Sequence, residues 1–387
     1  MFYELASPTF GDEEHAALNK VIESGFFSMG KYVAEFEQQF ARYHNKKHAV
    51  MVNSGSSANL IATAALCYKK DSPLKAGDEV IVPAISWATT YHPLQQYGLK
   101  LKFVDVQLNS LNIDISQLEN ALTKETKMIV GVSILGNPAA LDVIREFADK
   151  HNLYFLEDNC ESLDAELNNQ KTGTFGDIGT FSFFFSHHIS TMEGGMLITD
   201  DDELYQLALS LRNHGWTRGQ PEDSCIYDDK KDDFNEAYRF ILPGYNVRPT
   251  ELCGIVGLEQ LKKLPGFTEV RRKNLAVFHQ LFTDDKRFII QDELGKSSAF
   301  CFPMIVKKDS GLTREHVFSV LKAADIGFRM ITGGNFLRHD VIKHYQWSSV
   351  GDMINADYAH EHGFFIGNHP FDLTEQLTAL QSVLAQL

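Results

Sequence analysis

Short apolar runs alternate with amphipathic stretches from about residue 45 to residue 210 of the chain. The apolar runs carry almost no charge, which is typical of strands that are buried on both faces of a sheet. The amphipathic stretches at 59–70 and 141–151 favour helices that cover such a sheet. This order predicts an α/β fold with a large, mostly parallel sheet. The expected strands are 48–52, 79–83, 101–106, 127–134, 153–158, 180–185 and 196–199.

The segments on either side of this alternating region have different patterns. Residues 13–24 and 31–43 predict two helices that precede the sheet. Residues 214–248 are polar and acidic and contain several turn formers, so they predict a long loop of the kind that is often functional. A long helix is expected over 265–282. A smaller α/β unit then follows, with a strand over 299–306 and helices over 313–324 and 374–386.

The length of 387 residues is sufficient for two domains. We expect the N-terminal helices and the large sheet to form one domain over residues 1–250, and a smaller α/β domain to cover 251–387. The formal net charge of -15 argues against nucleic acid as a partner, because binding to phosphates requires a basic surface.

The cysteines form no CxxC pair and no tight group, which argues against a disulfide framework or a zinc ribbon and favours a reducing compartment. They are Cys67, Cys160, Cys225, Cys253 and Cys301. The N-terminal residues are acidic where a signal peptide would be basic. No apolar run approaches the ~20 residues of a membrane span. We therefore expect a cytoplasmic protein with no membrane partner.

Residues 53–60, Asn-Ser-Gly-Ser-Ser-Ala-Asn-Leu, follow the first expected strand and open a helix. Backbone N–H groups at a helix N-terminus can bind an anion, and the hydroxyls of Ser56 and Ser57 add donors. The same residues also suit an ordinary helix cap, so both interpretations stay open. No GxxxxGK[ST] motif is present, so a nucleotide P-loop is not supported.

Two acidic residues, Asp158 and Glu161, mark the end of the strand expected at 153–158. Ligands of α/β sheets bind at the carboxyl ends of the strands. A buried Asp158 at this edge could pair with a protonated ring nitrogen. It could equally cap a following helix.

The strand expected at 180–185 contains Ser182 and leads to His187 and His188. Neighbouring histidines cannot easily bind one metal ion, so we expect no metal site. Glu193-Gly194-Gly195 then opens the next strand, and the turn-rich loop 242–252 leads into a helix.

Together these segments resemble the DegT/DnrJ/EryC1/StrS sugar aminotransferase family, whose members are fold-type I pyridoxal phosphate enzymes that act on nucleotide-linked ketosugars. The resemblance covers nearly the whole chain and implies the aspartate aminotransferase-like fold. Its motifs occur in one order, at 26–37, 54–60, 83–90, 157–162, 182–195 and 244–249.

One position departs from the aminotransferases of this family. Their cofactor-bearing lysine lies six residues before the Glu-Gly-Gly motif, and in this chain that position is His187. No lysine lies between Lys171 and Lys230. An imidazole cannot hold the cofactor covalently. The substitution resembles a subgroup of 3-dehydratases, which implies non-covalently bound pyridoxal 5'-phosphate or pyridoxamine 5'-phosphate.

The resemblance also implies the reaction and its partners. The C3 hydroxyl of GDP-4-keto-6-deoxymannose would be removed with release of ammonia, on a route to colitose of lipopolysaccharide O-antigens. Glutamate would restore the pyridoxamine form. His187 would be the catalytic base and would then protonate the departing hydroxyl. An unperturbed imidazole pKa near ~6.5 is compatible with both roles.

Further residues are implied to bind the cofactor. Asp158 would pair with the protonated pyridine nitrogen, Trp87 would lie against the ring, and Glu161 would have a supporting role. The phosphate would be held by Gly55, Ser56 and Ser182.

The remaining implied roles concern the partner subunit and the substrate. Asn246 would reach the phosphate of the neighbouring subunit's cofactor, which implies a homodimer with shared active sites. Arg218 and Arg329 are candidates for binding the nucleotide diphosphate or the sugar, because a guanidinium binds phosphate bidentately. His188 is expected to contact the residues of the site without touching the cofactor itself.

Three alternatives remain. A CDP-linked 3-dehydrase also has this histidine, but it carries an iron–sulfur cluster, and the scattered cysteines argue against one. An ordinary aminotransferase would need a lysine displaced from position 187. A non-catalytic ligand-binding regulator would explain the loss of the lysine, but not the presence of Trp87, Asp158, Ser182 and Asn246 beside a specific histidine.

Overall fold

A computed structural model describes residues 3–228 and 232–387. Within these residues the large sheet has eight strands in the order β1-β9-β8-β5-β4-β2-β3-β13. Five neighbouring pairs, from β8 to β13, are parallel, and only β9 runs antiparallel to its neighbours β8 and β1. The bounds are β1 His48–Val52, β2 Glu79–Pro83, β3 Lys100–Val104, β4 Thr126–Val132, β5 Tyr154–Asp158, β8 Ile178–Ser182, β9 Gly195–Thr199 and β13 Trp347–Ser349. The predicted mostly parallel α/β sheet is confirmed.

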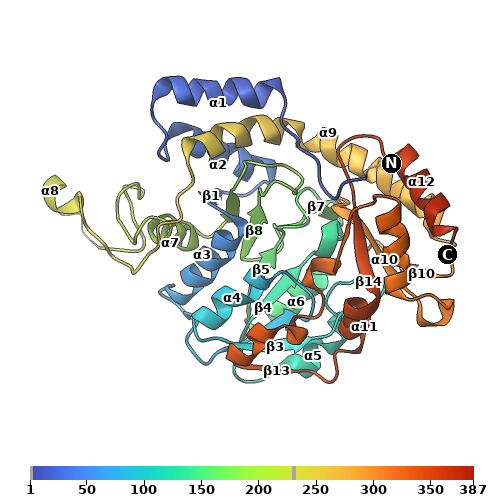
Figure 1. Ribbon diagram of the computed structural model, residues 1–387. Helices are drawn as coiled ribbons and strands as arrows, with labels where there is room; N and C mark the ends of the chain where they lie inside the picture. Colours follow the sequence, from blue (N-terminus) through green and yellow to red (C-terminus); the bar gives the residue numbers. More distant parts are fainter. Residues whose placement is uncertain (1–2, 229–231) are drawn as a thin grey trace.

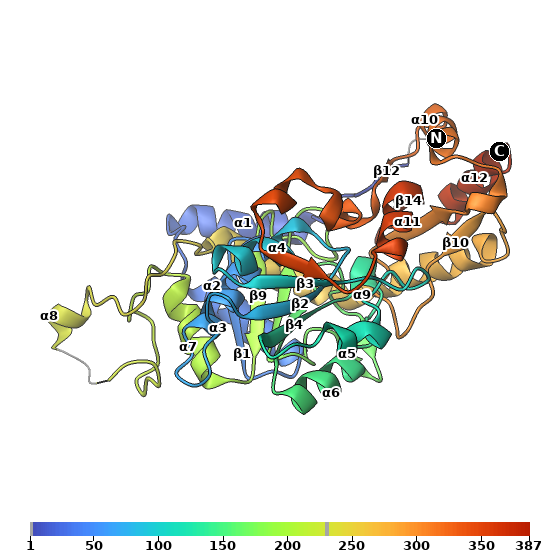
Figure 2. The same ribbon diagram turned by 90° about the horizontal axis from the view of Figure 1, so that it is seen from below.

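Alternation along the strands explains why both faces of this sheet are covered. In β2, Val80 and Val82 belong to one apolar core and Ile81 belongs to the other, because successive side chains point to opposite faces. The first core is covered by α3 (Gly55–Cys67), α4 (Ala88–Gln96) and α7 (Asp202–Leu211). The second is covered by α5 (Leu118–Ala121) and α6 (Leu141–His151), which Figure 2 shows on the opposite side of the strands.

The N-terminal helices pack on a long helix, and the second of them also packs on the sheet, where Phe40 meets Phe181 of β8. α1 (Asp12–Ser24) and α2 (Lys31–Tyr43) lie along α9 (Glu251–Phe282), as Figure 1 shows at the top of the molecule. α9 begins fourteen residues before the start predicted at 265 (265 − 251). Pro265 lies inside the helix, and the cap is Thr250, whose side chain accepts a hydrogen bond from the N–H of Cys253. The prediction was wrong because proline favours the first turn of a helix but does not require it.

The C-terminal residues form an antiparallel sheet in the order β10-β11-β14-β12. Its strands are β10 Phe288–Ile290, β11 Cys301–Val306, β12 Phe328–Arg329 and β14 Gly363–Gly367, and its helices are α10 Arg314–Ala323, α11 Ile354–His362 and α12 Thr374–Leu384. From the same part of the chain, β13 adds a parallel strand beside β3 of the large sheet. The division into domains at 250/251 stays a prediction.

The strand predicted at 180–185 ends at Ser182. Ser182 pairs with Gly195, the first residue of β9, so the ladder between the two strands stops there. Phe184 and Phe185 then leave the core and are each 45% exposed. The apolar run gave no signal for this end, because three phenylalanines in succession look alike whether they are buried or not.

We call the loop predicted at 214–248 the arm (residues 214–248). Its last residues lie on the body of the molecule, where the N–H groups of Tyr245 and Val247 donate to the carbonyls of Leu211 and Arg212. The arm contains the short helix α8 (Asp233–Glu236), which both ribbon views place far from the sheet. Residues 229–231 of the arm lie outside the described residues. A small hairpin, β6 (Glu166–Leu167) and β7 (Gln170–Lys171), follows β5.

Among the helices that the structure describes, none combines the length and the apolar surface needed to cross a lipid bilayer.

Candidate functional site

Strand directions bring the predicted motifs to one edge of the sheet. β5 and β8 are parallel, and β1 runs in the same direction as β8 because both are antiparallel to β9. Their carboxyl ends therefore meet at the same edge, where ligands of α/β proteins bind. Asp158 ends β5, Ser182 ends β8, and Gly55 opens α3 just after β1.

Gly55 and Ser182 lie in direct contact. A Cβ on Gly55 would lie 2.5 Å from the Cβ of Ser182 and 3.0 Å from the Sγ of Cys160, so only glycine fits without a shift. Ser54 is the N-cap of α3, and its Oγ accepts a hydrogen bond from the N–H of Ser57. The cap does not remove the anion site, since the N–H groups of the first helical turn have no partner inside the helix.

Asp158 is buried, and neutral donors surround it. Its Oδ2 accepts hydrogen bonds from Asn59 Nδ2 and Thr90 Oγ1, both at 2.8 Å, and its Oδ1 accepts from the N–H of Cys160 at 3.2 Å. Thr180 donates to Asn59 Oδ1 at 2.6 Å and so fixes the orientation of this amide. The alternative that Asp158 caps a helix is wrong, because β6 and no helix follows β5.

Sequence reasoning missed Asn59 and Thr90. Both belong to motifs that the resemblance quoted, at 54–60 and 83–90. A polar residue on the buried side of a helix usually has a specific partner, and Asn59 is 2% exposed and Thr90 also 2%. That burial could not be read from the sequence, because α3 is apolar around most of its surface.

Glu161 connects the two halves of the chain. Its Oε2 accepts a hydrogen bond from the N–H of Leu135 at 2.9 Å and another from the hydroxyl of Thr332 at 3.2 Å. Burial raises the pKa of Glu161 to about 7, and the charge of Asp158 adds to this effect.

This raised pKa predicts a specific pH dependence of stability. Between its ordinary value of 4.5 and about 7, Glu161 binds more protons in the folded chain than in the unfolded chain. Its contribution is therefore present at low pH and is lost as the pH rises through 7. Relative to Glu161→Gln, we expect the free energy of unfolding of the parent to fall by up to about 3 kcal/mol between about pH 5 and about pH 8.

Urea unfolding of the parent and of Glu161→Gln at each pH measures this difference. The control is Glu146→Gln, which removes an exposed carboxylate from α6 and should leave the difference from the parent constant. A constant difference for Glu161→Gln as well would contradict the raised pKa.

His187 lies in the turn between β8 and β9 and is held by packing. Its ring centroid is 5.3 Å from that of Phe300 and 6.2 Å from that of Phe184. Nδ1 is buried without a hydrogen-bond partner, so Nε2 is the nitrogen left for proton exchange. Burial and, to a lesser extent, the charge of Arg271 lower the pKa of His187 to about 4. The expectation of an unperturbed imidazole was wrong, because burial disfavours the charged form.

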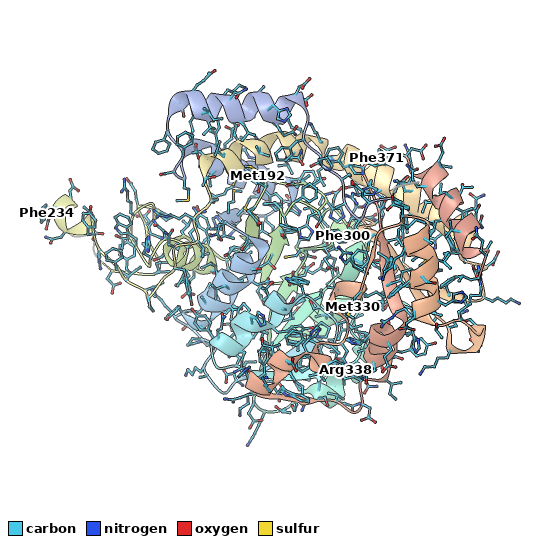
Figure 3. The ribbon with its side chains drawn as sticks, in the orientation of Figure 1. Met192, Phe234, Phe300, Met330, Arg338 and Phe371 are labelled. Carbon is cyan, nitrogen blue, oxygen red and sulfur yellow. The ribbon has the colours of Figure 1, made fainter. Side chains whose placement is uncertain are left out.

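Arg271 belongs to the basic run 271–273 of α9, but it is only 3% exposed. Its Nη1 donates to the carbonyl oxygens of Phe300 at 3.2 Å and Asn368 at 2.7 Å. Arg271 thus fixes the backbone of the residue whose ring packs on His187, and Figure 3 shows Phe300 near the centre of the molecule. Since burial lowers the pKa of Arg271 only to about 10, it keeps its charge at neutral pH.

His188 is fully buried, and its Nε2–H donates to the carbonyl of Ser298 at 3.2 Å. Burial keeps its pKa well below the ordinary value, so the ring is neutral. Its contacts link the turn between β8 and β9 to the segment that enters β11.

Three other predicted cofactor residues lie on segments next to these strand ends. Ser56 donates from Oγ to Thr89 Oγ1 at 3.1 Å, which joins the start of α3 to the start of α4. Trp87 is the N-cap of α4 and is 60% exposed. Asn246 is exposed, and the carbonyl of the next residue, Val247, accepts a hydrogen bond from the N–H of Asn53 at 2.9 Å.

The two predicted substrate arginines do not join this group within one chain. Arg329 is exposed on β12, and its Nη1 donates to the carbonyl of Phe328. Arg218 lies in the arm, 5.3 Å from the centre of the Trp216 ring. It lines a cavity of about 510 Å³ together with residues of α8, far from the strand ends (Figures 1 and 2).

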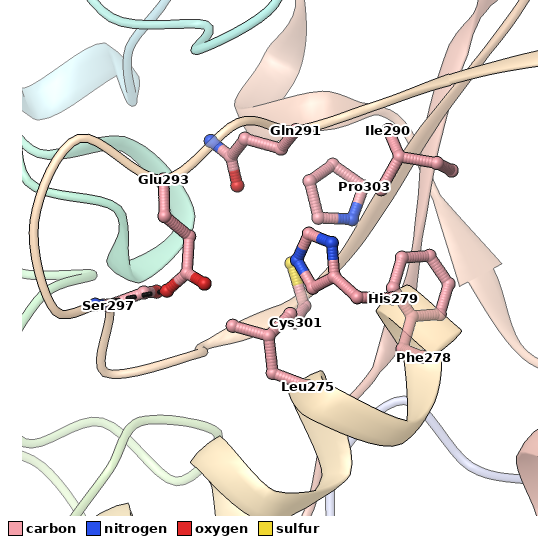
Figure 4. Close-up of a pocket in the computed structure, with 9 residues that line it drawn as sticks. All are labelled: Leu275, Phe278, His279, Ile290, Gln291, Glu293, Ser297, Cys301 and Pro303. Carbon is pink, nitrogen blue, oxygen red and sulfur yellow. Dashed lines mark hydrogen bonds between the residues drawn. The ribbon is translucent and has the colours of Figure 1, made fainter. Parts of the chain in front are cut away.

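A second cavity lies between α9 and β11 and is closed by Leu275, Phe278, Cys301 and Pro303 (Figure 4). Its volume of about 10 Å³ is that of a single water site. It is therefore too small for a cofactor or a sugar. Within the ranges 3–228 and 232–387, no three His, Cys, Asp or Glu side chains lie close enough to hold a metal ion.

Comparison with known proteins agrees with this arrangement. The model of the DegT/DnrJ/EryC1/StrS aminotransferase family matches residues 8–384. The chain is 50% identical to GDP-4-keto-6-deoxy-D-mannose 3-dehydratase of Escherichia coli over 384 residues, which cover 99% of both chains. It is 49% identical to the enzyme of that name from Yersinia pseudotuberculosis, over 99% of this chain and 98% of the relative.

The solved structure of the E. coli enzyme with bound hydrated PLP has a TM-score of 0.97 at 49% identity and covers 99% of each chain. Helicobacter pylori PseC, an aminotransferase, has a TM-score of 0.87 at 24% identity and so shows only the shared fold. The chain therefore belongs to the DegT/DnrJ/EryC1/StrS aminotransferase family.

Proposed function

We propose that this chain removes the C3 hydroxyl from GDP-4-keto-6-deoxymannose, giving GDP-4-keto-3,6-dideoxymannose and ammonia, with glutamate as the amino donor. The observation that carries the proposal is His187, in the turn that follows β8, in a stretch without lysine from 172 to 229. The two relatives named above, which align over nearly their full lengths, support the choice of substrate.

The residues at this edge fit pyridoxamine phosphate and pyridoxal phosphate. Gly55 and Ser182 form a cradle that a Cβ on Gly55 would fill, and α3 begins there, so that N–H groups of its first turn are available to a phosphate. Among the described residues, Asp158 has neutral hydrogen-bond donors and no cationic partner, which suits a protonated pyridine nitrogen. Gly55, Ser56 and Ser182 would hold the phosphate, and Trp87 would cover the ring.

When bound, the cofactor supplies an amino group for the C4 ketone and a ring that takes up electrons. His187 would transfer a proton from the C4′ carbon of the cofactor to the C3 hydroxyl of the sugar. Its lowered pKa keeps the imidazole neutral at pH 7, so Nε2 can accept a proton. The imidazolium that results is a strong proton donor, because its charge is buried. It then protonates the departing C3 hydroxyl. Phe300 and Phe184 keep the ring in place while Nδ1 stays out of the exchange.

We further propose that two copies of the chain share their sites. Large apolar side chains are exposed on the segments that carry the predicted site residues: Trp87 is 60% exposed, and Phe184 and Phe185 are each 45% exposed. Apolar surface of this kind marks an interaction site. The exposed Asn246, and the arm with Arg218, are free to approach a second copy. Arg329 remains a candidate for the substrate of its own chain, and the cytoplasm remains the predicted location.

The proposed function predicts two products besides the sugar, ammonia and 2-oxoglutarate. Purified protein with pyridoxal phosphate, glutamate and GDP-4-keto-6-deoxymannose should release ammonia and 2-oxoglutarate in equal amounts. An enzyme assay for each compound measures both. Consumption of glutamate without ammonia would instead indicate an aminotransferase, and binding without turnover would indicate a regulator. A CDP-linked substrate turned over in preference to the GDP-linked one would contradict the proposed nucleotide.

A further inference from the structure

Thr332 has a backbone conformation that threonine rarely adopts. It lies in the turn 331–334 with φ 38° and ψ 43°, and it is 5% exposed. A β-branched side chain at positive φ is a strained outlier. The next two residues, Gly333 and Gly334, also have positive φ and adopt it without this strain. A glycine at 332 would relieve the strain, so the threonine side chain must have a use.

The contact of that side chain identifies the use. The Thr332 hydroxyl donates to Oε2 of Glu161 at 3.2 Å. The second donor to the same oxygen, the N–H of Leu135, belongs to a residue that also has a left-handed backbone, with φ 55° and ψ 28°. Two strained turns, one after β4 and one before α11, thus converge on a single carboxylate oxygen.

The turn 331–334 is also fixed to the cofactor edge by its backbone. Just beyond it, the N–H of Phe336 donates to the carbonyl of Ala84 at 2.9 Å, and Asn335 forms a β-bridge with Ile85. Residues 84–85 lead directly to Trp87. The turn therefore spans two parts of the proposed cofactor site, the segment before α4 and the carboxylate after β5.

We propose that Thr332 is a positioning residue for Glu161: its hydroxyl holds this carboxylate beside Asp158 and makes the geometry of the site depend on the docking of the C-terminal turn 331–334. The proposal rests on the proposed function for its role in turnover. The hydrogen bond itself is independent of that function.

The test compares Thr332→Val, which keeps the shape and loses the hydroxyl, with Thr332→Ser, which keeps the hydroxyl. The hydroxyl stabilises the ionised carboxylate. Its loss should therefore raise the pH at which stability falls by about 0.5–1 pH unit, as expected for one hydrogen bond. The midpoint is measured by urea unfolding of the full chain against pH, with each variant also made in a Glu161→Gln background. Thr332→Ser should keep the midpoint of the parent.

The other titratable groups that interact with Glu161 are Asp158 at the end of β5, Cys160 in the following turn and Cys301 on β11. Burial raises the pKa of both thiols well above the ordinary value, so they stay neutral throughout the range. Asp158 contributes equally in the parent and in the Glu161→Gln background. Its contribution therefore cancels when the two pH profiles are subtracted.

An unchanged midpoint in Thr332→Val, or an equal shift in Thr332→Ser, would overturn the proposal. If Thr332→Val folds poorly, Thr332→Gly removes both the hydroxyl and the strain and should show the same shift. In turnover, kcat of Thr332→Val should fall about tenfold with KM nearly unchanged, and Thr332→Ser should restore it. A failure of the proposed function would abolish turnover in the parent but would leave the titration result intact.

Discussion

Replacing His187 with lysine should give a protein that binds pyridoxal phosphate through a covalent bond that borohydride reduces, whereas the parent should give none. A lysine amine at position 187 would face the same buried surroundings and the same nearby Arg271 that lower the pKa of the histidine. Both effects favour the neutral, nucleophilic amine. The dehydration rate should fall about 10²- to 10⁴-fold, the usual loss when a general base is removed.

Mass analysis of the reduced protein after digestion locates the label. His15→Lys is the matched control, because it adds a lysine on the exposed face of α1, away from the strand ends. This control should remain unlabelled at position 15. Label on the parent protein, or a His187→Lys variant labelled only at other lysines, would contradict the place given to His187.

Asp158→Asn should reduce the turnover number by about 10²- to 10⁴-fold, since an uncompensated buried charge costs about 3–5 kcal/mol. Asparagine has nearly the same shape but lacks the negative charge that would keep the pyridine nitrogen protonated. The fold should survive, because the hydrogen bonds at this position come from neutral groups, Asn59 and Thr90.

A graded control comes from the same network. Thr90→Val removes one neutral donor to Asp158 and leaves the charge. The turnover number should therefore fall about fivefold, as expected for the loss of one ordinary hydrogen bond. Steady-state kinetics of both variants give the comparison. Equal losses in Asp158→Asn and Thr90→Val would mean that Asp158 acts only as a hydrogen-bond acceptor.

The strands of the large sheet could be predicted from the sequence because each is a short apolar run between helical patterns. Their ends were less certain: β8 stops at Ser182, where its partner β9 begins, although the apolar run continues for three more residues. The start of α9 was missed because Pro265 suggested a first turn, while the actual cap is Thr250.

The candidate site shows a similar division. Asp158, Gly55 and Ser182 could be placed together because the ends of parallel strands meet at one edge. The lowered pKa of His187 depends on Arg271 and Phe300, which come from distant segments and meet it only through the fold. The strained conformation of Thr332 likewise follows from tertiary contacts and has no local signal in the sequence.

The mass of the sugar product tests the central claim most directly. Purified protein is incubated with pyridoxal phosphate, glutamate and GDP-4-keto-6-deoxymannose, and the nucleotide sugar is analysed by mass spectrometry. A product lighter than the substrate by one oxygen atom, with no nitrogen gained on the sugar, is the result that His187 in place of lysine predicts. A GDP-linked aminosugar would contradict it.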